Sequence, residues 1–192
     1  MRGQAPIVAR VGGVDRYVAF LRGMNLGGRR IKNEELRRHF EEMGFEQVAT
    51  FRASGNVIFA TAKREAEPKL AARVETELGE RLGYAVPVFL RSDAEVAAVA
   101  AQEPFEPKAV EKSKGKLQVS LLKKKPSAAT RKKVLALATD EDLLAIEARE
   151  LYWLPAGGLL ESSLDLKAIE KLLGSDTRRT MGTIEQIAAK LV

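Results

Sequence analysis

Two short segments of the chain gather residues that could bind a negatively charged ligand. The glycine-rich loop, residues 22–32, contains Arg22, Gly23, Asn25, Gly27, Gly28 and Lys32. The hairpin turn, residues 54–56, consists of Ser54, Gly55 and Asn56. Arginine and lysine supply positive charge, and glycines let backbone N–H groups approach a ligand closely. Serine and asparagine add neutral hydrogen-bonding groups. Together these residues predict a cradle for a phosphate or a carboxylate.

A purely structural interpretation of both segments stays open. Glycines after a strand are common turn residues, Ser-Gly-Asn is ordinary hairpin chemistry, and surface arginines are usually only solvated. The glycine-rich loop matches neither the phosphate-binding P-loop nor the dinucleotide-binding G-x-G-x-x-G pattern. The ligand-binding prediction therefore depends on whether the fold brings the two segments together.

The pattern of apolar residues predicts the elements that would do so. Residues 17–21 are expected to form a buried strand, and residues 33–43 a helix capped by Asn33. Residues 47–52 and 57–61 are expected to form two strands joined across the hairpin turn, followed by a helix at 67–82 and a strand at 86–90. This βαββαβ order is the ferredoxin-like unit, and it places the glycine-rich loop and the hairpin turn at the same end of the sheet.

The same order of elements is predicted to recur in the second half. A connecting helix at 92–101 precedes a strand at 116–122, a helix at 127–138 and a hairpin of residues 142–148 and 150–154. A helix at 162–173 with Leu164 on its apolar stripe, an extended piece near 177–180 and a helix at 184–191 follow. The expected fold class is α+β, with two ferredoxin-like (βαββαβ) halves packed together plus a C-terminal helix. We divide the chain into a flexible arm (1–15), a first half (16–101), a linker (102–115) and a more divergent second half (116–192).

The composition excludes several kinds of site. The 192 residues include no cysteine and one histidine, His39, so thiolate chemistry, disulfides and His clusters are absent. We expect no metal and no cofactor, and the sequence indicates no catalytic residue. His39 lies between Leu36 and Met43 on its helix and is expected to be a boundary residue rather than a general base. No apolar run approaches the ~18 residues of a membrane span. Residues 1–15 lack an apolar leader, so we expect a cytoplasmic protein. The sequence does not predict its oligomeric state.

Positive charge is concentrated in one region. Residues 107–133 carry ten basic residues and one acid, a local charge of +9, which leaves −3 for the rest of a chain whose net charge is +6. Within it, the basic stretch, residues 123–133, could bind a nucleic-acid backbone in a salt-dependent manner through Lys123, Lys124, Lys125, Arg131, Lys132 and Lys133. A solvated loop and helix face explains such a run more simply. Strand 57–61 lacks the aromatic pattern of RNA-recognition modules, and Phe20 and Phe59 are expected to face the helices as core.

A third function, protein–protein interaction, is suggested by aromatic residues in the second half. Tyr152 and Trp153 lie in a predicted strand, where burial is the simplest expectation. Were they exposed at an edge, they could pair subunits, since such residues are enriched at interfaces.

The first half resembles the DUF1697 family, whose members are named for lacking a known function. The resemblance rests on residues 17–28 (YVAFLRGMNLGG), Ile31-Lys32, Glu35-Leu36, residues 54–59 (SGNVIF), Phe89-Leu90-Arg91 and Pro104-Phe105. It spans roughly residues 16–192, strongly in the first half and weakly in the second. It implies a two-lobed α+β fold with ferredoxin-like halves, and it implies no activity.

The chain departs from the family pattern at several positions. Ala53 replaces the glutamine usual before Ser-Gly-Asn, and Glu161 and Ser163 stand where basic residues are usual. The segment 176–180 lacks the asparagine and tryptophan of the family's Thr-Thr-Arg-Asn-Trp pattern. The resemblance therefore supports a site in the first half and gives no support for a contribution from the second.

Overall fold

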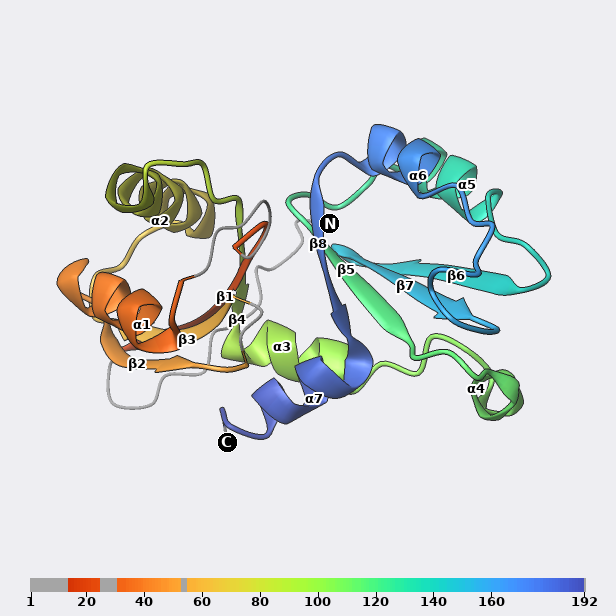
Figure 1. Cartoon of the computed structure of the whole chain (residues 1–192), viewed down its shortest axis with the longest axis horizontal. Coiled ribbons are helices and arrows are strands. Elements are labelled where there is room, and N and C mark those ends of the chain that lie inside the picture. The colour runs from red at the N-terminus through yellow and green to blue at the C-terminus, as the bar shows by residue number, and fades with distance from the viewer. Residues whose placement is uncertain (1–13, 25–30, 53–54, 192) are drawn as a thin grey trace, which may run out of the picture. The chain divides into compact units, whose positions relative to one another are not determined.

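A computed structural model describes residues 14–24, 31–52 and 55–191 (Figure 1). These residues fall into two compact units. The first unit extends to Ala98 and includes Lys190 and Leu191, and the second comprises Val99–Ala189. In the described part of the chain, no helix is long and apolar enough to cross a membrane.

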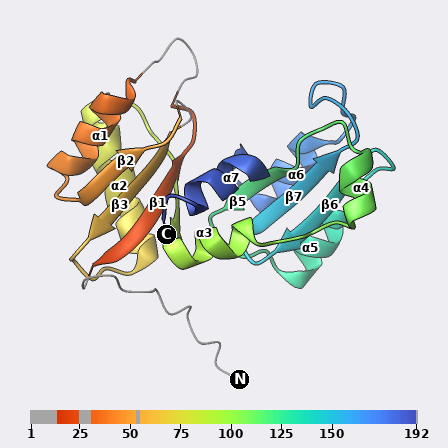
Figure 2. The ribbon, with the colours of Figure 1, turned by 90° about the horizontal axis from the view of Figure 1, so that it is seen from below.

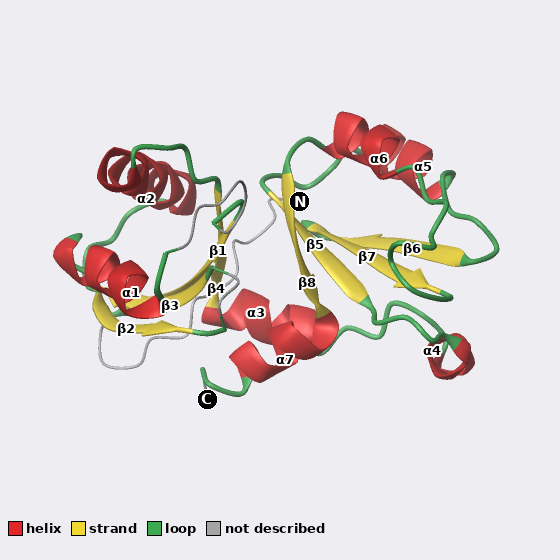
Figure 3. Ribbon diagram, viewed as in Figure 1, coloured by secondary structure: helices red, strands yellow, loops and turns green. Residues whose placement is uncertain are grey.

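The first unit is built on a four-stranded antiparallel sheet (Figures 1 and 3). Its elements follow the order β1 (Asp15–Leu21), α1 (Asn33–Glu42), β2 (Glu46–Thr50), β3 (Asn56–Thr61), α2 (Glu67–Leu82), β4 (Val88–Ser92) and α3 (Asp93–Ala100). The strand order is β2-β3-β1-β4, with β1 pairing antiparallel to both β3 and β4. The ferredoxin-like order predicted from the sequence is therefore confirmed for this half.

One face of this sheet and the helices α1 and α2 form the core of the first unit. Alternate residues of the central strands, Tyr17, Ala19 and Leu21 on β1 and Phe59 on β3, point into this core. The two helices contribute apolar residues spaced three or four apart, as amphipathic helices do; these are Leu36, Phe40, Leu70, Val74 and Leu78. Helix α2 spans the residues that the sequence predicted and ends at Gly83, which has a left-handed conformation (φ 73°).

The second unit repeats this architecture. Its elements are α4 (Pro107–Lys112), β5 (Gln118–Leu122), α5 (Ala128–Leu135), β6 (Asp142–Glu147), β7 (Glu150–Pro155), α6 (Leu166–Leu173), β8 (Asp176–Thr180) and α7 (Met181–Ala188). The strand order β6-β7-β5-β8 matches that of the first sheet. Helices α5 and α6 cover one face, where Val134 and Ile169 pack against Leu151 and Trp153. Strand β8, which had little support in the sequence, completes this second ferredoxin-like unit.

Individual backbone contacts also correspond between the two units. The N–H of Leu21, the last residue of β1, donates to the carbonyl of Gly55 at 2.8 Å. In the second unit the N–H of Leu122, the last residue of β5, donates to the carbonyl of Arg149 at 2.9 Å. The glycine-rich loop after Leu21 and the basic stretch after Leu122 therefore occupy equivalent places in the two units.

The last strands of the two units correspond as well. Arg91 pairs with Val18 across β1 and β4, and Arg179 pairs with Val119 across β5 and β8. Each arginine donates from Nη1 to the carbonyl of the preceding residue at 2.7 Å. Burial lowers the pKa of Arg179 to about 10, so its guanidinium stays charged at neutral pH.

Each last strand also ends in a hydroxyl that caps the helix behind it. Ser92 accepts from the N–H of Glu95 before α3, and Thr180 accepts from the N–H of Thr183 before α7. The repeat is thus βαββαβα, one helix longer than the unit predicted from the sequence.

Three expectations about individual residues were wrong, and the segment predicted as a linker (102–115) contains the short helix α4. Lys32 is the N-cap of α1, and Asn33 is its first helical residue. Leu164 precedes α6, because Asp165 caps that helix by accepting from the N–H of Ala168. Phe20 is fully buried, but alternation along β1 places it on the sheet face away from α1 and α2.

Burial of aromatic side chains on the two sheets bears on two of the predicted functions. Phe20 and Phe89 are nearly inaccessible to solvent in the first unit, so this face offers no platform for stacking bases. Tyr152 and Trp153 are 1% and 2% exposed in the second unit. Their burial removes the basis for a protein–protein interaction surface on this strand.

Candidate functional site

The end of β1 and the β2–β3 hairpin meet at one end of the first sheet, as the strand order predicted. Besides the Leu21–Gly55 bond, the N–H of Phe51 donates to the carbonyl of Asn56 at 2.9 Å and closes the hairpin. The N–H of Arg22 donates to the carbonyl of Pro87 at 3.0 Å, which ties the start of the glycine-rich loop to the segment before β4. Three chain segments are therefore fixed around this end of the sheet.

Gly55 is the residue at which the hairpin approaches β1 most closely. Its φ is +70°, and a Cβ atom there would lie 2.9 Å from Met24 Cγ and 3.0 Å from Leu21 Cβ. Both the conformation and the space thus require glycine. Gly23, just after β1, also has a positive φ of 75°. The backbone conformation therefore explains why two of the predicted site residues are glycines.

Some of the other predicted ligand-binding residues are among the described residues, and some are not. Asn25, Gly27, Gly28 and Ser54 lie outside the described residues. Arg22 is half-buried beside Leu21, and Lys32 is exposed at the start of α1. Asn56 is fully buried, and its Nδ2 donates to the carbonyl of Phe51 at 2.9 Å. Asn56 therefore shapes the hairpin rather than facing solvent.

Among the described residues, no side chain caps the N-terminus of α1, and the helix end is open in that sense. Its N-cap, Lys32, has an extended conformation and provides no side-chain cap hydrogen bond. The first N–H groups of a helix have no partners within the helix, and the helix dipole favours negative charge there. Glu34 and Glu35 in the first turn already supply some of that charge. An incoming anion must compete with them.

The basic stretch lies on the β5–α5 loop and on α5 itself. Lys123, Lys124 and Lys125 are exposed on the loop, and Arg131, Lys132 and Lys133 are exposed on the helix. Helix α5 differs from α1 because Ser127 caps it, accepting from the N–H of Thr130 at 3.1 Å. The equivalent loops of the two units thus differ in charge and in capping.

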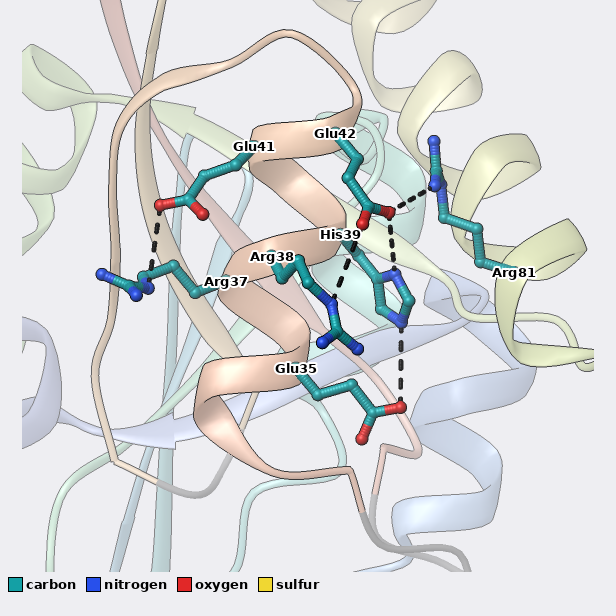
Figure 4. Close-up of polar contacts among 7 residues, drawn as sticks. All are labelled: Glu35, Arg37, Arg38, His39, Glu41, Glu42 and Arg81. Atoms are coloured by element: carbon teal, nitrogen blue, oxygen red, sulfur yellow. Dashed lines mark hydrogen bonds and ion pairs between the residues drawn. The ribbon is translucent and has the colours of Figure 1, made fainter.

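His39 belongs to a surface network that connects α1 with α2 (Figure 4). Its Nδ1 lies 3.7 Å from Glu42 Oε2 and its Nε2 lies 3.9 Å from Glu35 Oε1, distances too long for hydrogen bonds. Arg81 of α2 donates to the same Glu42 oxygen at 2.8 Å. His39 is 13% exposed and lies between carboxylates of its own helix, consistent with the predicted boundary position.

The structure also contains a polar cluster that sequence reasoning missed. Asp142 at the start of β6 is 1% exposed, and its Oδ1 accepts from Trp153 Nε1 at 2.7 Å and from Ser162 Oγ at 2.8 Å. Thr139 Oγ1 donates to the other oxygen at 3.3 Å. The one signal in the sequence was a tryptophan that, if buried, needs an acceptor for its N–H.

Metal binding and acid–base chemistry receive no support from the described residues. Among them, no group of three or more His, Asp or Glu side chains could hold a metal ion. The pKa of Tyr17 is raised, first by burial and then by Asp15, which keeps the phenol protonated at neutral pH. Among the described residues at the end of the first sheet, no side chain is identified as a nucleophile or a base.

Comparison with known proteins identifies the family. A family model described as protein of unknown function (DUF1697) matches residues 14–152. The chain belongs to the DUF1697 family. A search of curated proteins finds no match. Among solved structures, the conserved bacterial protein SP0830 from Streptococcus pneumoniae has a TM-score of 0.65 and 19% identity, covering 93% of this chain and 99% of that chain. At this identity the likeness supports the fold alone, and the family carries no activity to transfer.

Proposed function

We propose that this DUF1697 protein binds a small anionic ligand, a nucleotide or a phosphorylated metabolite, between the glycine-rich loop and the hairpin turn. The observation that carries the proposal is the hydrogen bond between Leu21 and Gly55. It joins the end of β1, where the glycine-rich loop begins, to the hairpin turn. A site on a fixed sheet end loses less conformational entropy on binding than one on separate loops.

The charged residues around this sheet end suggest the type of anion. Arg22 would pair with the ligand, Lys32 would add positive charge, and the open N-terminus of α1 would supply backbone N–H groups. Glu34 and Glu35 lie in the same first turn and oppose an anion. A phosphate should still bind better than a single carboxylate, because it offers more acceptor oxygens to the backbone N–H groups. Such ligands are concentrated in the cytoplasm, which is where we propose that the protein acts.

Thermal-shift measurements with a panel of nucleotides and phosphorylated metabolites test this proposal. Arg22→Ala is compared with Arg64→Ala, an exposed arginine beyond the far end of β3 in the same sheet. We expect one ligand to raise the melting temperature of the wild type and of Arg64→Ala, but not that of Arg22→Ala, at moderate salt. A panel without any stabilising ligand, or equal stabilisation of all three proteins, would contradict the proposal.

Nucleic-acid binding through the basic stretch is the second candidate, and the exposure of all six of its predicted basic side chains favours it. Because the sheet faces are buried, such binding would be electrostatic and would not involve base stacking. The triple variant Lys123→Ala, Lys124→Ala, Lys125→Ala should bind short single-stranded RNA more weakly. Its plot of log K against log salt should be shallower by roughly 0.7 for each phosphate that the variant no longer neutralises. An unchanged slope would exclude these lysines.

A further inference from the structure

The second unit contains a pocket remote from both loops discussed above. It has a volume of about 280 Å³ and lies where β6 begins and β7 ends. Its lining comes from the end of α4 and the segment after it, the start of β6 and the loop after β7. It includes Lys112, Lys114, Glu141, Gly157, Gly158 and Glu161. This volume is at the lower limit for small-molecule sites, which suits a ligand of few atoms.

Backbone hydrogen bonds fix the walls of this pocket relative to one another. The N–H of Lys114 donates to the carbonyl of Ala156 at 2.8 Å, and the N–H of Ala156 donates to the carbonyl of Glu141 at 2.6 Å. Gly115 packs so closely against the loop after β7 that a Cβ atom would lie 2.5 Å from the carbonyl oxygen of Gly157. Three segments distant in sequence are therefore held in one arrangement, which lowers the entropy lost when a ligand binds.

Asp142 forms part of the lining but is already engaged with the protein. Both of its oxygens accept hydrogen bonds, from Trp153, Ser162 and Thr139. A buried carboxylate with several donors is a stable structural element. The charges left for a ligand are therefore those of the exposed residues Lys112, Lys114, Glu141 and Glu161.

These residues present two positive and two negative charges. In the described part of the chain, neither Lys112 nor Lys114 forms an ion pair. Glu161 accepts from the N–H of Gly158 at 3.2 Å, so Glu141 is the less engaged carboxylate. A phosphate would be repelled by the two acids, and a metal ion by the two lysines. Mixed charges over a small volume instead match a ligand that carries both signs.

A second, more apolar pocket adjoins the first. Its volume is about 200 Å³, and it shares Lys112, Glu141 and Ala156 with the first pocket. Its apolar lining comes from Ala109 of α4, Leu143 of β6 and Leu154 of β7. Figure 2 shows α4 beside the β6 edge of the sheet, where this second pocket lies. The charged pocket and the more apolar pocket therefore share part of their walls.

We propose that this double pocket binds a small apolar α-amino acid. The carboxylate of the ligand would pair with Lys112 and Lys114, and its ammonium group with Glu141. Its side chain would enter the compartment lined by Ala109, Leu143 and Leu154. The α-carbon of such a ligand carries a positive group, a negative group and an apolar side chain, and the two pockets are lined by groups that complement all three.

Isothermal titration calorimetry with L-leucine on the whole protein tests this proposal. N-acetyl-leucine lacks the ammonium charge, leucinamide lacks the carboxylate, and glycine lacks the side chain. We expect saturable binding of leucine and at least about tenfold weaker binding of each analogue. No saturation with leucine up to about 10 mM, or equal binding of the blocked analogues, would overturn the proposal.

Three single variants locate the site. We expect Lys114→Ala and Glu141→Gln to weaken leucine binding at least about tenfold. Lys167→Ala, an exposed lysine on α6, should bind like the wild type. All three residues are exposed, so the variants should fold, which circular dichroism checks. Binding that is unchanged in Lys114→Ala and Glu141→Gln would place the ligand elsewhere and overturn the assignment.

Discussion

At the scale of single residues, the requirement for glycine at position 55 of the candidate site can be measured as a change in stability. Gly55→Ala should lower the free energy of unfolding by about 2–4 kcal/mol, because alanine at positive φ costs about 1 kcal/mol or more and its Cβ would contact Met24 and Leu21. Urea denaturation measures the loss.

Gly44 provides the matched control for Gly55. Its φ is +83°, yet nothing lies within 4 Å of the position that a Cβ would take. Gly44→Ala should therefore show only the conformational cost, about 1 kcal/mol. Equal losses for the two variants would mean that the close approach of the hairpin to β1 contributes nothing to stability.

Asp142 allows a second prediction at this scale. Asp142→Ala should cost about 2–5 kcal/mol, because it leaves the Trp153 N–H and the Ser162 hydroxyl without their acceptor in a buried site. The exposed neighbour Asp140 is the control, and Asp140→Ala should stay within about 0.5 kcal/mol of the wild type. A loss below about 1 kcal/mol for Asp142→Ala would show that water replaces the carboxylate.

At the scale of elements, the link between α1 and α2 predicts a small, salt-sensitive contribution to stability. Arg81→Ala removes the 2.8 Å hydrogen bond with Glu42 and the 3.5 Å ion pair with Glu77. These side chains are partly exposed, so the loss should be about 0.2–1 kcal/mol at low salt and smaller in about 1 M salt. Urea denaturation at the two salt concentrations measures it. A loss that is independent of salt would point to the packing of the arginine stem instead.

Element order was predictable from the sequence because it follows from apolar periodicity and glycine stops. Helix α2 illustrates this, since its four-residue spacing and Gly83 fix both its face and its end. Helix α4 was missed because Pro107–Lys112 is a helix of only six residues with no buried residue. The start of α6 was misplaced because the serines at 162 and 163 are also plausible N-caps, and only the hydrogen bond between Asp165 and Ala168 decides among them.

The proposed site at the sheet end could be predicted from the sequence, and the double pocket could not. The sheet end near Gly55 followed from topology, because a βαββαβ unit always places those two loops together. The double pocket depends on hydrogen bonds between backbone groups distant in sequence, such as Lys114 and Ala156. Every residue type can make such bonds, so no residue pattern marks them.

At the scale of the whole molecule, two compact units with separate helix-facing cores predict two unfolding transitions. The only tryptophan, Trp153, lies in the core of the second unit, so its fluorescence reports on that unit, while far-UV circular dichroism reports on both. In Gly55→Ala the circular-dichroism transition should begin at lower urea, and the fluorescence midpoint should stay unchanged. Movement of both signals together would show that the units unfold as one.

The path of the chain also affects how the protein is made on the ribosome. Arg16 Nη1 donates to the carbonyl of Leu191 at 2.8 Å, and Lys190 Nζ lies 5.6 Å from the ring centroid of Phe51. All four residues belong to the first unit, although the whole second unit lies between them in sequence. A nascent chain can form the first sheet early, but it can make these two interactions only after the second unit has been translated. Translation stalled in the second unit would therefore leave a first unit that lacks part of its native stabilisation.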